Sequence, residues 1–266
     1  MKKGNRGAII IILLILVYLL IPLVVSIIYS LSSNWAGILP KGFTLRAYNT
    51  IFHDKAFLAS LGRTIVISIV PIVLTILLVL LALFVTTIYF PRLEKYVQII
   101  CMIPYTIQGV ILSVSILTLY VMNPKFLSNR IVMLIGAYCI IILPYIYQGI
   151  RNGMRAVNMP VLLEAAEMLG ASRIYAFFRI IVPNIISAII VSSLLAVGII
   201  FGDYVLDRNL ASSAWPNVQI YLYQSMKNDS VKASAVFVVI MAVTFIISAV
   251  VLYLRSREGK DRRVNE

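Results

Sequence analysis

Charged residues are scarce in this sequence. Asp, Glu, Lys and Arg make up only 12% of the 266 residues, whereas 61% of the residues are hydrophobic. A soluble domain carries about 25% charged residues, so this deficit argues against an ordinary soluble protein and indicates an integral membrane protein. One bundle of spanning helices with modest loops accounts for the length better than one or two soluble domains do.

Residues that carry metal and redox chemistry are almost missing. His53 is the only histidine, which argues against a histidine-based metal site or catalytic triad within the chain. Cys101 and Cys139 both lie inside apolar runs and are interpreted as small buried hydrophobes rather than as a disulfide or a metal pair. We therefore expect no catalytic residue and no metal site.

A phosphate-binding loop is also missing, because no Gly-x4-Gly-Lys-Ser/Thr run occurs. We expect no cofactor in this chain itself. The net charge of +13 does not indicate nucleic acid binding, since the Lys and Arg residues lie between apolar runs and form no basic stripe interleaved with aromatics.

Six apolar runs are long enough to cross a membrane, which takes about 20 residues per helix. They are continuously apolar rather than alternating, so they predict helices and not a barrel. The first follows a basic start but is too long for the core of a signal peptide, and we expect it to stay as an uncleaved span. Residues 1–266 are thus predicted to form a single all-α transmembrane domain, with spans at about 8–31, 62–90, 96–121, 130–150, 184–205 and 233–254.

The distribution of Lys and Arg predicts the orientation. If both termini are cytoplasmic, 14 of the 23 basic residues lie on the inner side, as the positive-inside rule requires. The inner residues are Lys2, Lys3, Arg6, Arg92, Lys95, Arg151, Arg155, Arg173, Arg179, Arg255, Arg257, Lys260, Arg262 and Arg263. Larger outer loops are then expected near 32–61 and 206–232.

The third and fourth spans carry interior helix breakers: Pro104 with Gly109 in the third, and Pro144 in the fourth. Proline in a spanning helix frees a carbonyl and bends the helix. Such bends line transport pathways in some proteins and are ordinary packing features in others, and the sequence leaves both interpretations open.

The run "LLEAAEMLGASRIYAFFRIIVPNI", from Leu162 to Ile185, is a charged interruption between the fourth and fifth spans. Pro160 suits a helix start, Gly170 a stop, and Ser172 the cap of the next helix. The pattern predicts a helix–turn–helix on the membrane surface. The expected apolar faces are Leu162, Leu163, Ala166 and Leu169 in the first helix, and Ile174, Phe177, Phe178 and Ile181 in the second.

Such periodicity alone would fit an interfacial amphipathic linker, but the segment also resembles the EAA motif of permease subunits of bacterial binding-protein-dependent ABC importers. Glu164-Ala165-Ala166, Gly170, Ile180 and Pro183 stand at the motif positions, while Val182 replaces the usual leucine. The resemblance extends over most of the chain, because six spans with this motif before the fifth is the layout of the maltose- and methionine-type permeases.

The resemblance implies a coupling helix within residues 156–183 that docks on a separate ATPase subunit, which would bind ATP and Mg²⁺. It also implies three kinds of partner: an ATP-binding cassette ATPase dimer, a second permease that is identical or homologous, and an extracytoplasmic solute-binding protein. The implied location is the bacterial cell membrane.

The solute is less clear. The stretch "FGDYVLD" resembles permeases of the polyamine, ferric iron, phosphonate and sulfate branch, and spermidine/putrescine permeases most. Asp203 and Asp207, with Tyr204 between them, are expected at the outer edge of the fifth span, where two carboxylates would attract a cation such as a polyamine. Iron complexes, phosphonates, other anions and sugars remain alternatives, and Asp203 as a solvated helix end is the plainer interpretation.

Three other classes of membrane protein fit the sequence less well. A secondary transporter or channel would usually carry ionisable residues at mid-membrane, and the six runs hold none that is clear. An intramembrane enzyme would need paired carboxylates or a nucleophile–histidine couple. A membrane scaffold would leave the EAA match unexplained.

Overall fold

The computed structural model describes residues 4–34, 41–107, 109–121, 129–211 and 214–264. These residues are helical apart from loops and one short antiparallel hairpin, in which β1 (Ser32–Asn34) pairs with β2 (Lys41–Phe43). The prediction of an all-α membrane protein is confirmed, and the hairpin is a small feature that the apolar pattern does not signal.

Five helices in the described residues are long and apolar enough to span a membrane, and up to six if one bent pair counts as a single span. The five correspond to predicted runs. They are α1 (Gly4–Ser30), α3 (Lys55–Ile88), α6 (Arg130–Ala156), α9 (Val182–Gly202) and α12 (Ser230–Val264).

The run 96–121, expected as one helix, is the bent pair. It consists of η1 (Pro91–Leu93), α4 (Glu94–Met102) and η2 (Ile103–Thr106), followed by α5 (Gly109–Val121). The segments Pro91–Thr106 and Gly109–Leu119 meet at 102°. Pro104 cannot donate a helical hydrogen bond and Gly109 is a weak helix former, so an apolar stretch of sufficient length still breaks here.

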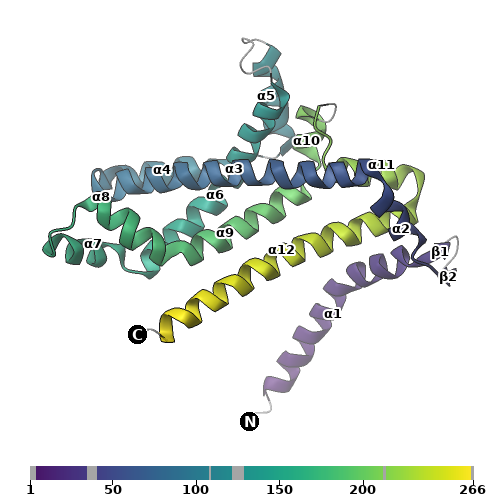
Figure 1. The fold of residues 1–266 in the computed structure, drawn as a ribbon, viewed down its shortest axis with the longest axis horizontal. Coiled ribbons are helices and arrows are strands. Elements are labelled where there is room, and N and C mark those ends of the chain that lie inside the picture. The colour runs from purple at the N-terminus through teal and green to yellow at the C-terminus, as the bar shows by residue number, and fades with distance from the viewer. Residues whose placement is uncertain (1–3, 35–40, 108, 122–128, 212–213, 265–266) are drawn as a thin grey trace. The chain divides into compact units, whose positions relative to one another are not determined.

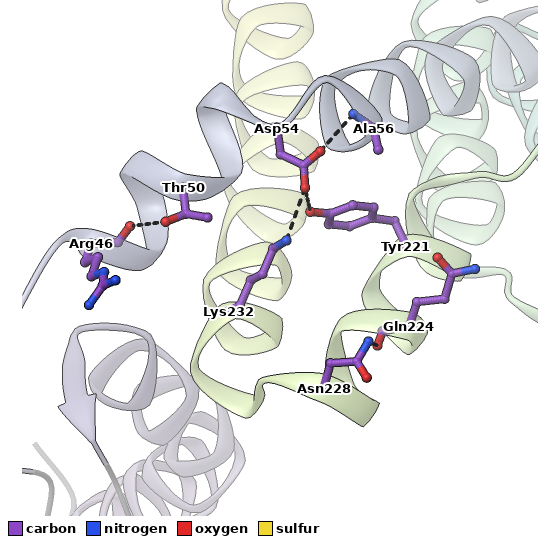
Figure 2. Close-up of polar contacts among 8 residues, drawn as sticks. All are labelled: Arg46, Thr50, Asp54, Ala56, Tyr221, Gln224, Asn228 and Lys232. Atoms are coloured by element: carbon purple, nitrogen blue, oxygen red, sulfur yellow. Dashed lines mark hydrogen bonds and ion pairs between the residues drawn. The ribbon is translucent and has the colours of Figure 1, made fainter.

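The chain divides into two units by packing. The first takes the described residues up to Ala59 and those from Tyr221 to Val243, and it holds α1, the hairpin and α2 (Arg46–His53). Its polar centre is Asp54, which lies between α2 and α3 (Figure 2). Tyr221 Oη donates to Asp54 Oδ2 over 2.5 Å, and Lys232 Nζ donates to the same oxygen over 3.1 Å.

The other carboxylate oxygen of Asp54 accepts from the Ala56 backbone N–H over 2.9 Å and so caps the start of α3. The hydrogen bond from Tyr221 lowers the pKa of Asp54, assisted by Lys232 and opposed by partial burial. One ionised carboxylate therefore joins the start of α3 to α11 (Val218–Asn228) and to the first turn of α12.

The second unit takes the described residues from Ser60 to Ile220 and from Thr244 onward. Its core is the pair α6 and α9, which run side by side (Figure 1). Gly149 and Gly153 of α6 face Ser192 and Ala188 of α9, and a Cβ at Gly153 would lie only 2.5 Å from that of Ala188. Small residues on both helices allow this close approach, as is common between membrane helices.

Candidate functional site

The segment with the EAA motif forms α7 (Met159–Met168), directly after α6. Asn158 takes a left-handed conformation with φ 49° and turns the chain, and Pro160 lies in the first turn of the helix. Gly170 has φ +82°, a conformation that glycine adopts without a steric penalty. The predicted start and stop of the first surface helix are confirmed.

The two faces of α7 differ in exposure. Met159 and Ala166 are 2% and 4% exposed and point into the unit, whereas Glu164 and Ala165 are exposed. Leu169, which was predicted on the apolar face, is 88% exposed, and Met168 beside it is 91% exposed. The helix ends at Met168, so both side chains lie at its tip.

The segment after the turn is held by local polar contacts. Ser172 Oγ accepts from the Tyr175 N–H over 3.3 Å, which confirms its predicted role as a cap. Glu167 forms an ion pair with Arg173 across the turn. Of the expected apolar face in the second helix, Phe177 and Ile181 are fully buried, while Ile174 and Phe178 are exposed.

The sequence predicted a second surface helix that is separate from the fifth span, but in the structure the two are continuous. Residues Arg173–Gly202 run on as one helical stretch of 30 residues, made of α8 (Arg173–Ala176), η3 (Phe177–Ile181) and α9. Within η3 the chain forms a π-turn, and the Val182 N–H donates to the Phe177 carbonyl five residues earlier. The wider turn carries the helix past Pro183, which lies in the first turn of α9. Ile180 is half-buried in that π-turn.

A second polar group lies at the opposite end of α9. The Asp203 carboxylate accepts from the Leu206 N–H over 3.1 Å and so caps α10 (Val205–Leu210). Tyr138 Oη of α6 donates to the same oxygen over 3.1 Å.

Asp207 is fully buried, and its Oδ2 accepts from the Asn217 backbone N–H over 2.8 Å. In the described parts of the chain, its Oδ1 has no hydrogen-bond partner. Burial raises the pKa of Asp207 to about 7. The sequence did not single out Asn217, whose side-chain amide also donates to the Asp203 carbonyl over 3.0 Å.

The remaining pathway candidates lie apart from one another. Tyr204 is half-buried and contacts Arg208, whose Cζ lies 5.8 Å from the Tyr204 ring centroid. Pro104 lies in η2 at the bend, and Pro144 is buried inside the unbroken helix α6. Thus only Asp203 and Asp207 share a site, and whether any of the five candidates contacts a solute stays a prediction.

Comparison with known proteins identifies the family. A family model described as "Binding-protein-dependent transport system inner membrane component" matches residues 93–260, more than half of the chain. The chain is 21% identical over 260 residues to PhnV of Salmonella typhimurium, named as a 2-aminoethylphosphonate transport system permease protein, with 97% of each chain covered. It is 20% identical over 235 residues to PotC of Escherichia coli, a spermidine/putrescine transport system permease protein, covering 87% of this chain and 88% of PotC.

A solved structure shares the fold. It is the crystal structure of a bacterial ABC transporter involved in the import of the acidic polysaccharide alginate, with a TM-score of 0.73, 17% identity and 96% of each chain covered. The resemblance based on the EAA motif is therefore confirmed. The chain belongs to the binding-protein-dependent transport system inner membrane components, the non-catalytic permease subunits of ABC importers.

Proposed function

We propose that this chain forms half of the solute pathway of an ATP-driven importer, and that a separate ATPase dimer moves it through residues 156–183. The observation that carries the proposal is the apolar tip of this segment, Met168 and Leu169, which are 91% and 88% exposed. Exposed apolar side chains of this size belong to contacts with another protein or with the membrane, and the EAA motif in the same segment favours a partner protein. Glu164 and Ala165, also exposed, extend that contact along α7.

The packing behind the tip provides the route by which ATPase closure would act. Ala166 and Phe177 are buried against the unit, so α7 and the π-turn are held to the core. The chain then continues without a break into α9, whose 21 residues extend over roughly 30 Å. Displacement of α7 would therefore be carried along α9 and, through α7's direct connection, into α6.

The partners follow from the family. We propose that both termini and α7 lie in the cytoplasm of a bacterial cell, on the basis of the Lys and Arg distribution. One EAA segment makes half of a pathway, so a second permease, identical or homologous, would complete it. An extracytoplasmic binding protein would deliver the solute from the other side of the membrane.

For the solute we propose a small primary alkylammonium compound, with a polyamine as the first candidate. Two named relatives support this class. PotC is named for spermidine and putrescine, which are amines, and PhnV is named for 2-aminoethylphosphonate, which carries an aminoethyl group. The second relative makes an aminophosphonate the alternative within the same class.

The coupling proposal is tested by Leu169→Asp in the purified complex with its ATPase. Burial of a leucine side chain is worth about 1.5–3 kcal/mol, so its loss should weaken ATPase association by roughly tenfold to a hundredfold. Gly170→Asp and Glu164→Lys should likewise uncouple ATP hydrolysis from transport while the chain stays in the membrane.

The matched control is Val161→Asp, since Val161 is also on α7 and is 55% exposed but lies away from the tip. It should retain most of the ATPase affinity. Normal uptake by an assembled Gly170→Asp complex, or equal losses at Val161 and Leu169, would contradict the proposal.

The solute class is tested by uptake into proteoliposomes that contain the complex and its binding protein. We expect uptake of putrescine, spermidine or 2-aminoethylphosphonate, and none of ethylphosphonate, which lacks only the amine. Uptake of ethylphosphonate at the rate of its amino analogue would show that the ammonium group is not what is recognised.

A further inference from the structure

A cavity of about 970 Å³ opens along the half of α6 and α9 that adjoins α7. All its lining residues belong to the second unit. They come from η2, α6, α9 and the C-terminal part of α12. Small-molecule sites typically enclose about 300–1,000 Å³, so the hollow has the size of a ligand site.

The cavity exists because the side chains at its floor are small. Gly149 and Gly153 have no side chain to fill it, and Ala188 and Ser192 oppose them from α9. Larger neighbours such as Gln148 and Leu195 also line it. The close contact that holds α6 and α9 together thus also shapes a groove beside it.

The polar groups of the lining carry no charge. Tyr105 and Tyr145 form an edge-to-face pair with ring centroids 5.0 Å apart. Gln148 is exposed and donates through Nε2 to Met102 Sδ over 3.2 Å, which directs its carbonyl oxygen elsewhere. Asn152 and Ser187 add an amide and a hydroxyl to the lining.

Gln148 lies near the end of the apolar run 130–150, and Asn152 lies in the segment that follows it. Together with the two aromatic rings, Gln148, Asn152 and Ser187 give the lining a polar but uncharged surface.

We propose that this cavity is the solute-contact surface of the chain and that it takes an alkylammonium group, with the cation over the faces of Tyr105 and Tyr145 and its N–H groups donating to the Gln148 and Asn152 carbonyls. This proposal rests on the importer function proposed above. Tyrosine rings attract ammonium groups, and amide oxygens accept from them.

A lining without charged side chains suits transport of a cation better than it suits tight binding of one. A carboxylate in the groove would hold an ammonium strongly in a site of low dielectric, whereas a conducting path must bind weakly enough to release. Asp203 and Asp207 lie at the other end of α9 and their carboxylates already accept hydrogen bonds within the protein. We therefore assign solute contact to the neutral side chains that line the cavity.

The test uses the assembled complex in proteoliposomes. Tyr105→Leu removes the ring and should lower the amount of amine transported per ATP hydrolysed by roughly twofold to fivefold, while Tyr105→Phe retains the ring and should transport normally. Gln148→Leu should also lower this ratio. Asn184→Leu is the matched control, because Asn184 is an exposed polar residue of α9 outside the cavity.

A second measurement labels Gln148→Cys with a water-soluble maleimide, against the background of Cys101 and Cys139 in the unaltered chain. We expect labelling that slows during solute turnover, whereas Asn184→Cys should react at the same rate with and without solute. If Gln148→Cys does not react in the assembled complex, the groove is buried against the second permease or lipid and the proposal is overturned.

The two proposals fail in different ways. If the unaltered complex takes up no amine, the proposed solute class is wrong, and protection of Gln148→Cys by whichever solute is transported still decides whether the cavity is a solute site. If the amine is transported but Tyr105→Leu and Gln148→Leu leave the transport ratio unchanged, the importer function stands and the cavity assignment is wrong.

Discussion

Asp54 and Asp207 are both aspartates outside the long apolar helices, yet their surroundings move their pKa values in opposite directions. A hydrogen bond from Tyr221 lowers the pKa of Asp54, while burial raises that of Asp207 to about 7. Asp54 contributes stability above its unfolded pKa of about 4, and this is lost as the pH falls through its lower folded value. Asp207 holds a proton that the unfolded chain has released, so its contribution falls as the pH rises from about 4 to 7.

The contrast is testable with Asp207→Asn, which can keep the hydrogen bond from Asn217 but cannot ionise. Relative to the unaltered chain, its melting temperature should rise progressively between about pH 4 and pH 7 and level off above that range. The measurement is thermal unfolding in detergent across that range. Asp54→Asn is the control, and its melting temperature should lie below that of the unaltered chain throughout. A constant difference for Asp207→Asn would show that Asp207 does not titrate in this window.

Residues whose role depends on their neighbours in the chain were predictable. Pro160, Gly170 and Ser172 begin, end and cap helices through geometry that extends over three or four positions. Asp207 was expected at an accessible edge, but its burial depends on Asn217, ten residues later. Such a pairing is set by tertiary packing, and no local sequence pattern predicts it.

At the scale of the element, the apolar runs located the spans but not their continuity. The run 96–121 is apolar enough to span and still breaks at Pro104 and Gly109, whereas α6 passes through Pro144 without interruption. The length of an apolar run indicates that the segment prefers lipid, but it does not show whether the segment forms one helix or two. The close contact of α6 and α9 did leave a visible signal, the two glycines four residues apart at Gly149 and Gly153.

The close contact between α6 and α9 predicts the effect of adding one methyl group at a glycine. Gly153→Ala places a Cβ 2.5 Å from that of Ala188, and we expect a loss of about 1–3 kcal/mol in unfolding free energy from overpacking. Gly136→Ala is the control on the same helix, since nothing lies within 4 Å of a Cβ there. It should be neutral or stabilising by up to about 1 kcal/mol. Chemical denaturation in detergent checks both, and equal effects would argue against close packing at Gly153.

At the scale of the whole molecule, the EAA segment identified the family because its residues form a long pattern with a recognisable spacing. The groove beside it was not predicted, since its lining comes from four separate segments that only the fold brings together. Composition and motif thus predicted the class of protein, and packing located the candidate solute surface.

The assembly itself can be checked by purifying the tagged chain from its native membranes in mild detergent. Mass spectrometry should find an ATP-binding cassette ATPase, an extracytoplasmic binding protein and either a second six-span permease or a second copy of this chain. Recovery of the chain alone, active in sealed vesicles without ATP, would contradict the proposed importer.

The π-turn at Phe177–Ile181 has a consequence for changes in chain length. Removing one residue from an ordinary helix rotates everything before the deletion by about 100° and shifts it by about 1.5 Å. Within α9 such a deletion would swing α7 around the helix and change the direction in which its apolar tip points. Removing one residue inside the π-turn converts it to a regular turn and leaves both flanks in phase. A one-residue deletion within Phe177–Ile181 should therefore displace α7 less than a one-residue deletion within α9.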